Sequence, residues 1–312
     1  MGDVQSTFII NKKEYISLKH VGKGSFGTVN LVKDGDGDGS KFILKTVLND
    51  NSENEVRLMK LLSYYPRCNP YIICLHDYEI TEEYIYILME YVEGSDLGKF
   101  IKYKNSRETD FTLFDKWFRQ AIMGLCYMHN LGIIHRDIKP ANLLIDVNRN
   151  LKYIDFGLSR QYKHEYISVA TGTKCYKEPY LKTACYYTDI YALGITFVKI
   201  LKPTVDLCNV KAVSDAIDSI KFPLNYNFYK ELLHKMTRVT ANRPSAQEIL
   251  DYLNLNGATS LVIRDYKKCL VNVKGVTTGI KSIKKGVKNI KKSIKKGVKS
   301  VKSVKIKINK NK

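Results

Sequence analysis

Features typical of membrane-spanning and secreted proteins are absent from this sequence of 312 residues. It has no run of about eighteen apolar residues and therefore predicts no transmembrane segment. Its first residues lack the hydrophobic region of a signal peptide. The seven cysteines are scattered singly, with no C-x-x-C pair, which favours free thiols over a disulfide framework or a zinc site. Together these absences predict an intracellular protein in a reducing compartment.

Acidic residues are also absent from residues 266–312, although this stretch contains 17 lysines. The stretch therefore carries most of the formal net charge of +20 and leaves +3 for residues 1–265. Because the main body is nearly neutral, the whole chain cannot be only a membrane-binding or nucleic-acid-binding protein. With 44% hydrophobic and 11% aromatic residues, the chain can bury an ordinary core.

The lysine-rich tail, residues 257–312, contains an eleven-residue repeat that starts at Ile283 and again at Ile294. Its apolar residues recur every three or four positions, so a helix would carry one apolar stripe. Glycines and β-branched residues disfavour that helix in water, and we expect an amphipathic helix only on binding. The tail is predicted to bind an anionic membrane or nucleic acid, or to be a solvated tail or nuclear address. Only the membrane accounts for both the charge and the stripe.

Two short motifs near the start are weak. Residues 1–6 fit the N-myristoylation pattern M-G-x-x-x-[ST], but Asp3 fits it poorly, so residues 1–7 are expected to be a disordered start. Residues 34–40 alternate Asp and Gly like half of an EF-hand calcium loop. The loop's twelfth position, which needs a glutamate, is Lys45, so an acidic turn between strands is the better interpretation.

The richest stretch of the sequence is His135–Gly157. Asn142 and Asp155 are candidate Mg²⁺ ligands, Asp137 is a candidate base, and Lys139 supplies a cation next to it. Apolar runs flank these residues, so short buried strands are expected to hold them in place. A carboxylate and an amide in this arrangement can hold Mg²⁺ on a nucleotide's phosphates while a second carboxylate accepts a proton from a hydroxyl.

A glycine-rich stretch lies further towards the N-terminus, with Gly22, Gly24 and Gly27 in a G-x-G-x-x-G pattern. Such glycines let backbone N–H groups approach phosphate oxygens. A dinucleotide-binding turn would need a helix directly after the glycines, but residues 28–32 are typical of a strand. The loop is therefore expected to join two antiparallel strands, and Lys45 ends the next strand.

These motifs resemble those of eukaryotic-type protein kinases of the serine/threonine subgroup. His135–Asn142 matches H-R-D-x-K-x-x-N and Asp155–Gly157 matches D-F-G. The resemblance covers about residues 8–256 and implies an α+β, two-lobed protein kinase fold. A small lobe (about 8–90) would hold an antiparallel sheet and one main helix, and a larger lobe (about 91–256) would be mostly helical. It further implies ATP and Mg²⁺ as cofactors and proteins as substrates.

The resemblance also assigns roles. Asp137 would be the base, Lys139 would neutralise the transferring phosphoryl group, and Asn142 and Asp155 would hold Mg²⁺. Lys45 would contact the α- and β-phosphates and pair with Glu55, with Glu53 as the alternative. The residues expected to bind ATP are Val21, Gly22, Gly24, Gly27, Val29, Lys45, Glu90, Val92, Asp96 and Leu144.

Regulation is expected around the segment that follows the metal-binding loop. Arg136 would pair with a phosphorylated residue, with Ser168 or Thr171 as candidates. The hydroxyl of Thr173 would bridge the catalytic aspartate and lysine. His135 is expected to be structural and to pack with Phe156, Leu75 and Met59.

Two positions depart from the family pattern. Ile43 stands where an alanine usually lies above the adenine ring, and Tyr180 replaces the glutamate of Ala-Pro-Glu. That glutamate usually pairs with an arginine, here Arg243, and Glu178 or Tyr180 remains open as its substitute. A pseudokinase scaffold is therefore the alternative function, although the principal catalytic residues are all present.

Overall fold

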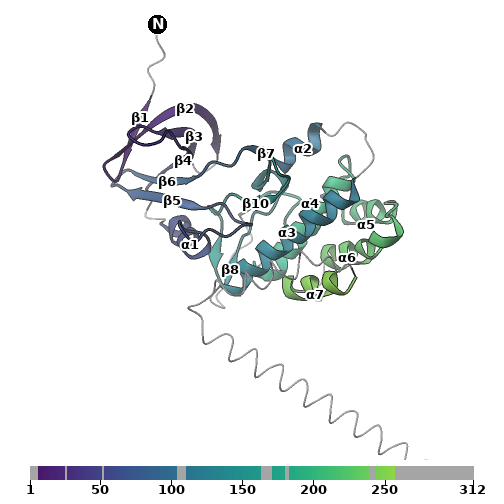
Figure 1. Cartoon of the computed structure of the whole chain (residues 1–312). Helices are drawn as coiled ribbons and strands as arrows, with labels where there is room; N and C mark the ends of the chain where they lie inside the picture. Colours follow the sequence, from purple (N-terminus) through teal and green to yellow (C-terminus); the bar gives the residue numbers. More distant parts are fainter. Residues whose placement is uncertain are drawn as a thin grey trace, which may run out of the picture. The chain divides into compact units, whose positions relative to one another are not determined.

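The computed structural model describes residues 6–24, 27–50, 53–103, 110–162, 171–179, 183–238 and 243–256. All of them belong to residues 1–263, the first of two units into which the chain divides. Figure 1 shows a sheet with one helix on one side of this unit and a group of helices on the other. The two-lobed α+β fold predicted from the sequence is confirmed.

The small lobe is built on a six-stranded antiparallel sheet with the order β1-β2-β3-β4-β6-β5. Its apolar cluster includes Tyr15, Val32, Phe42 and Leu88, which are at most 8% exposed. Helix α1, Asn54–Leu62, buries one face, including Leu58. The strands are β1 (Thr7–Ile10), β2 (Lys13–Gly24), β3 (Gly27–Asp34), β4 (Lys41–Leu48), β5 (Leu75–Ile80) and β6 (Tyr84–Glu90).

Two strand predictions need correction. The alternating residues Phe8–Leu18 predict a single opening strand, but the structure has a hairpin there, because Asn11 and Lys12 have φ values of 51° and 66° and turn the chain. The apolar run Ile72–Leu75 also predicts a strand of the small lobe, but the strand begins only at Leu75, since Ile72 forms an isolated bridge with Tyr153 in the large lobe. Alternation of side chains could not show which partner each extended segment would find.

The large lobe packs around α3 (Phe111–Asn130) and α4 (Tyr186–Leu201). Phe114, Phe118, Phe197 and Tyr229 form a cluster of edge-on aromatic contacts between these helices and α6. The apolar spacing within Phe111–Leu131 predicts a helix over this range, and α3 confirms it to within one residue. The remaining helices are α2 (Leu97–Tyr103), α5 (Val210–Asp218), α6 (Phe228–Thr237) and α7 (Ala246–Asn256), with short 3₁₀ turns η1 (Pro140–Asn142) and η2 (Leu224–Tyr226).

Two small sheets carry the loops that contain the candidate catalytic residues. One has the order β10-β9-β7, with β7 at Gly94–Asp96, β9 at Leu143–Asp146 and β10 at Leu151–Tyr153. The other pairs β8 (Ile133–Ile134) with β11 (Arg160–Gln161). These short strands anchor both ends of the loops around residues 135–142 and 154–159.

The cysteines differ from the expectation. Cys68 pairs with Cys74, and Cys175 pairs with Cys208, as disulfides with Cα–Cα distances of 5.3 Å and 4.5 Å. The prediction of free thiols is therefore wrong for these four residues. Spacing along the chain carries no signal for the second pair, whose members are 33 residues apart. Among the described helices, none is long and apolar enough to cross a membrane.

Candidate active site

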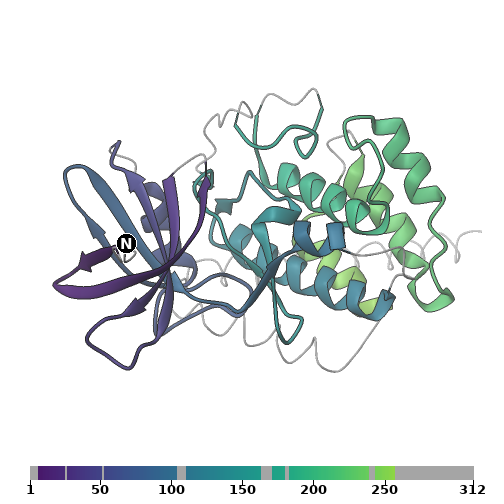
Figure 2. The same cartoon turned by 90° about the horizontal axis from the view of Figure 1, so that it is seen from above.

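A cleft of about 990 Å³ lies between the two lobes. Its walls come from the sheet, from the β6–β7 connection and from the loops around residues 137–142 and 154–158. Figure 2 shows the sheet and the helical lobe on opposite sides of this region. The cleft is large enough for a nucleotide and part of a peptide.

Asp137 is the centre of a hydrogen-bond network on the large-lobe side of the cleft. One carboxylate oxygen, Oδ1, accepts hydrogen bonds from the Thr173 hydroxyl at 2.7 Å and the Thr173 backbone N–H at 3.0 Å. The other, Oδ2, accepts from Asn142 Nδ2 at 2.9 Å and pairs with Lys139 Nζ at 2.8 Å. Lys139 also donates to the Thr173 hydroxyl at 2.8 Å. The predicted bridge by Thr173 is therefore present in the geometry.

Lys45 occupies the opposite side of the cleft. Its Nζ lies 2.7 Å and 2.9 Å from the two carboxylate oxygens of Glu55 and 3.1 Å from Asp155 Oδ1. Burial would lower the pKa of Lys45, but the two carboxylates outweigh burial and raise it. Lys45 therefore stays cationic. Glu55, not Glu53, is its helix partner.

Asp155 remains an anion in this arrangement. Burial would raise its pKa, but Lys45 and the backbone N–H of Gly157 outweigh burial and hold the pKa below its ordinary value. The pKa of Glu55 is raised, because burial there outweighs the attraction of Lys45. Of these two carboxylates, Asp155 has the lowered pKa, and Asp155 is the one that lines the cleft.

Asn142 and Asp155 suit a hard divalent cation. Asn142 uses its amide nitrogen to donate to Asp137, and Asp155 uses Oδ1 to accept from Lys45 and Gly157. The Asn142 Oδ1 and Asp155 Oδ2 atoms have no hydrogen-bond donor among the described residues. Carboxylate and amide oxygens are the ligands that Mg²⁺ takes in proteins, with water and phosphate oxygens completing its shell. The donor set therefore fits the predicted Mg²⁺.

Most of the residues predicted to bind ATP line the same cleft: Val21, Gly27, Val29, Lys45, Glu90, Val92, Asp96 and Leu144. Asp96 pairs with Leu144 across β7 and β9, so one polar and one apolar group meet there. The Asp96 carboxylate also accepts from the Lys99 backbone N–H at 2.9 Å at the start of α2. This position lets Asp96 bind the helix backbone and also make the nucleotide contact expected from the resemblance.

The three glycines are not equivalent. A side chain at Gly27 would collide with the Thr46 carbonyl of β4, and its φ of 146° favours glycine. At Gly22, a Cβ would meet nothing within 4 Å. Gly22 is not among the described residues that line the cleft, so its phosphate contact, like that of Gly24, stays a prediction. Ile43, the departure from the family pattern, does line it.

His135 has a structural position. It is fully buried, and its ring centroid lies 5.3 Å from that of Phe156 and 5.5 Å from that of Tyr153. Burial lowers its pKa, so the ring is neutral. Asp189 of α4 accepts hydrogen bonds from the backbone N–H groups of His135 and Arg136 at 2.8 Å and 2.9 Å. This buried carboxylate fixes the start of the catalytic loop.

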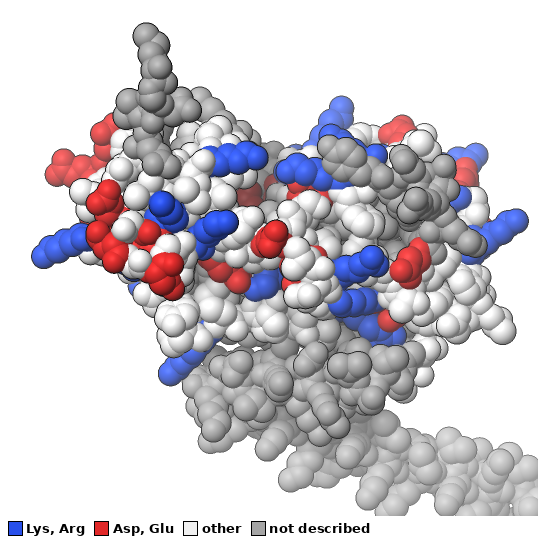
Figure 3. Space-filling model, turned by 45° about the horizontal axis from the view of Figure 1, so that its top comes forward, with Lys and Arg blue, Asp and Glu red and all other residues white. Residues whose placement is uncertain are grey.

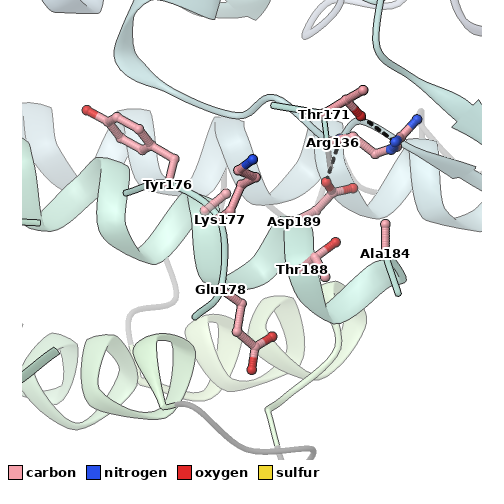
Figure 4. Close-up of a pocket in the computed structure, with 9 residues that line it drawn as sticks. Arg136, Thr171, Tyr176, Lys177, Glu178, Ala184, Thr188 and Asp189 are labelled. Atoms are coloured by element: carbon pink, nitrogen blue, oxygen red, sulfur yellow. Dashed lines mark hydrogen bonds between the residues drawn. The ribbon is translucent and has the colours of Figure 1, made fainter. Parts of the chain in front are cut away.

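The segment after the metal-binding loop is held at two points, of which Figure 4 shows the first. Arg136 donates a short hydrogen bond to the Thr171 hydroxyl, so Thr171 lies where the regulatory prediction needs it. Ser168, the other candidate, lies outside the described residues. Glu178 forms a buried ion pair with Arg243, so Glu178 takes the place of the glutamate that the family pattern has at position 180.

Sequence reasoning missed several cleft residues. Lys19 and Lys99 line the cleft, and Lys99 pairs with Asp96 at 3.2 Å. Glu90, which was predicted to bind ATP, lines the cleft, and its carboxylate pairs with Lys152 at 2.6 Å and accepts from the Cys74 backbone N–H. Surface lysines are common on strands and helices, so only the assembled cleft distinguishes Lys19 on β2 and Lys99 on α2 from ordinary surface residues.

The protein kinase domain family matches residues 15–253 of this chain. The chain belongs to the protein kinase family. It is 30% identical over 265 residues to "Probable serine/threonine-protein kinase KIN1 homolog" from Enterocytozoon bieneusi, covering 82% of this chain and 42% of that protein. It is 35% identical over 194 residues to "CBL-interacting serine/threonine-protein kinase 21" from Arabidopsis thaliana, covering 58% and 45%.

A third relative, "Serine/threonine-protein kinase Nek3" from Oryza sativa subsp. japonica, is 29% identical over 260 residues, covering 78% of this chain and 44% of that protein. The chain thus spans less than half the length of these three relatives. The similarity supports the kinase-domain architecture described above. The similarity does not extend the substrates or partners of these longer proteins to this chain.

Proposed function

We propose that this kinase-family chain is an active Mg²⁺- and ATP-dependent protein serine/threonine kinase. One observation carries the proposal. Asp137, bonded to Thr173, Lys139 and Asn142, faces the Lys45–Glu55–Asp155 cluster across the cleft. A pseudokinase would be expected to lack one of these groups, and none of them is missing.

Each residue has a distinct task in the proposed reaction. Asp137 orients the acceptor hydroxyl and takes its proton as the oxygen attacks the γ-phosphorus, after which ADP leaves. Lys139 neutralises charge on the transferring phosphoryl group, and Lys45 holds the α- and β-phosphates. Asn142 and Asp155 would hold Mg²⁺, which neutralises phosphate charge when bound. Because ATP is the donor, we place the protein in an intracellular compartment.

The test is transfer of labelled phosphate from ATP to casein by the full chain, followed by identification of the labelled amino acid. Asp137→Ala should abolish labelling of serine and threonine. Asp251→Ala, which removes an exposed carboxylate on α7, should leave it intact and serves as the matched control. Labelling that survives in Asp137→Ala contradicts the proposal. Wild-type protein that binds ATP but labels no serine or threonine also contradicts it, and this second result favours the scaffold alternative.

We also propose that the basic tail anchors this kinase to an anionic membrane surface. Support comes from the 17 lysines of residues 266–312 and from the apolar stripe, which binding to nucleic acid does not need. Helical circular dichroism induced by anionic vesicles but not by neutral ones would agree with it. Binding of duplex DNA with a steep salt dependence and no response to vesicles would support nucleic acid instead.

A further inference from the structure

A covalent bond holds the chain close to the proposed catalytic base. Cys175 lies two residues beyond Thr173, whose hydroxyl and backbone N–H both donate to the Asp137 carboxylate. A disulfide joins Cys175 to Cys208, with the two Cα atoms 4.5 Å apart. No step of the reaction proposed above uses this bond, although it joins the turn after Thr173 to a distant part of the large lobe.

The two ends of the disulfide are held differently. Cys208 directly precedes Asn209, whose side chain accepts from the Ala212 backbone N–H at 3.0 Å and caps α5. The Cys208 backbone N–H donates to Asp206 Oδ1 at 3.0 Å. Cys175, by contrast, lies in a turn outside any helix or strand. The disulfide therefore attaches an irregular turn to the capped start of a helix.

The backbone of Cys175 is in a conformation that needs such a restraint. Its φ of 72° lies in the left-handed region, which residues with a side chain rarely adopt. Such a conformation persists where several contacts hold it at once. One contact is the hydrogen bond from the Tyr176 backbone N–H to the Thr173 carbonyl, at 3.2 Å, and the disulfide is another.

Thiols in solution can reach this bond. Cys208 is exposed and Cys175 is partly exposed, and exposed disulfides are the more easily reduced ones. Figure 3 shows both charge signs interspersed over the face that it draws, so a small charged thiol meets no extended field of one sign there. The intracellular compartment proposed above is generally reducing, and disulfides in such compartments are usually transient.

We propose that the Cys175–Cys208 disulfide is a redox modification site that controls the turnover of this kinase. When the bond is closed, it keeps Thr173 on the Asp137 carboxylate. When a thiol reductant opens it, Cys175 relaxes towards an ordinary φ and Thr173 moves away from Asp137. The proposal rests on the proposed kinase activity and adds its regulation.

The modification is a thiol–disulfide exchange. A thiolate of the reductant attacks Cys208 Sγ, the bond to Cys175 Sγ breaks, and Cys175 leaves as a thiolate that takes up a proton. A second thiolate, from the same dithiol or another thiol molecule, attacks the reductant's sulfur in the mixed disulfide and releases Cys208. Two electrons pass to the cysteines, and the reductant becomes a disulfide. An oxidised thiol closes the bond by the reverse steps.

The experiment measures transfer to casein by the full chain in mixtures of reduced and oxidised glutathione, while alkylation and mass spectrometry follow the Cys175–Cys208 bond. As the bond opens, wild-type kcat should fall by at least about fivefold, because small displacements at a reacting centre slow the reaction. The KM for ATP should change by less than about twofold, since Lys45 and its partners are not attached to the bond.

Two variants make the test specific to this bond. Cys208→Ser should have the low kcat at every glutathione ratio. Cys68→Ser removes the other disulfide and should keep the wild-type dependence on the ratio. Melting temperatures establish that both variants are folded before their kcat values are compared.

The outcomes separate this proposal from the kinase proposal. An unchanged or higher kcat when the bond opens, or a Cys208→Ser variant that still follows the ratio, overturns the redox proposal and leaves the kinase proposal standing. A bond that is fully open or fully closed at every ratio overturns it as well. No Asp137-dependent transfer at any ratio removes the kinase proposal itself.

Discussion

At the residue scale, His135 and Asp137 lie two positions apart and have different surroundings. His135 is enclosed by Tyr153 and Phe156, whereas Asp137 lines the cleft. The Nδ1 atom of His135 accepts a hydrogen bond from the Asp137 backbone N–H at 3.3 Å. The buried Nε2 atom of His135 has no hydrogen-bond partner among the described residues. A ring of similar size should therefore fill the site without its nitrogens.

We accordingly predict that His135→Phe keeps kcat within about fivefold of wild type, because a phenyl ring keeps the aromatic contacts with Tyr153 and Phe156. Asp137→Asn should lower kcat by about 10²–10⁴-fold, the usual range for a lost general base. Single-turnover transfer at saturating ATP measures both. A loss in His135→Phe as large as that in Asp137→Asn, in a folded protein, would mean that the histidine takes part in the reaction.

The buried ion pair between Glu178 and Arg243 contributes to stability. Its side chains are 6% and 1% exposed, so removal of the carboxylate leaves a buried cation. We predict that Glu178→Ala lowers the free energy of unfolding by about 3–5 kcal/mol. The matched change is Glu231→Ala, which breaks a largely exposed ion pair with Lys235 and should lower the free energy of unfolding much less. Urea denaturation gives both values, and equal losses would show that Arg243 finds another partner.

Residue identities were the most predictable part of the site. Lys45, Asp137, Asn142, Asp155 and Thr173 were expected from the resemblance to protein kinases, and they line one cleft. Glu55 was expected to pair with Lys45, and it does. The Glu178 substitution was left open, because two neighbouring residues differ from the family pattern and only packing decides which of them reaches Arg243.

At the element scale, local patterns predicted helices better than strand partners. Helix α3 agrees with its pattern because twenty residues repeat one periodicity and Asp110 caps the start. The first strand was misjudged at Asn11 and Lys12, where two residues in the left-handed region turn the chain without a glycine. Segment 72–74 was misjudged because it pairs across lobes, with Tyr153.

The tie between the segment 171–179 and the chain before α5 also belongs to this scale. Cys175–Cys208 closes a loop with a sequence separation of 33 residues, so we predict that Cys208→Ser lowers the free energy of unfolding by about 2–4 kcal/mol. Cys185→Ser changes a cysteine outside both disulfides and should have a smaller effect.

Thiol counting under denaturing, non-reducing conditions adds an independent check. The count for wild type should be two thiols lower than for the same protein in which only the Cys175–Cys208 disulfide has been reduced. If a strong reductant leaves the difference in stability between wild type and Cys208→Ser unchanged, the disulfide is not what stabilises the segment.

At the scale of the whole molecule, charge is divided between a nearly neutral catalytic body and a strongly basic tail. The body's fold was predictable because motifs at fixed spacing imply one family. The tail, residues 257–312, lies outside the described residues, and its predicted helix stays a prediction. Its function can be separated from catalysis because all the cleft residues precede it.

We predict that a chain ending at residue 256 phosphorylates soluble peptides with wild-type kcat/KM but no longer sediments with anionic vesicles. The informative comparison keeps every lysine and replaces the apolar stripe by serine, at Ile280, Ile283, Val287, Ile290, Ile294, Val298, Val301 and Val304. If the stripe enters the membrane interface, this variant should bind vesicles at least about tenfold more weakly, because it no longer buries apolar area. Binding equal to wild type would show that lysine charge alone holds the chain, and the anchor would then be electrostatic with no inserted helix.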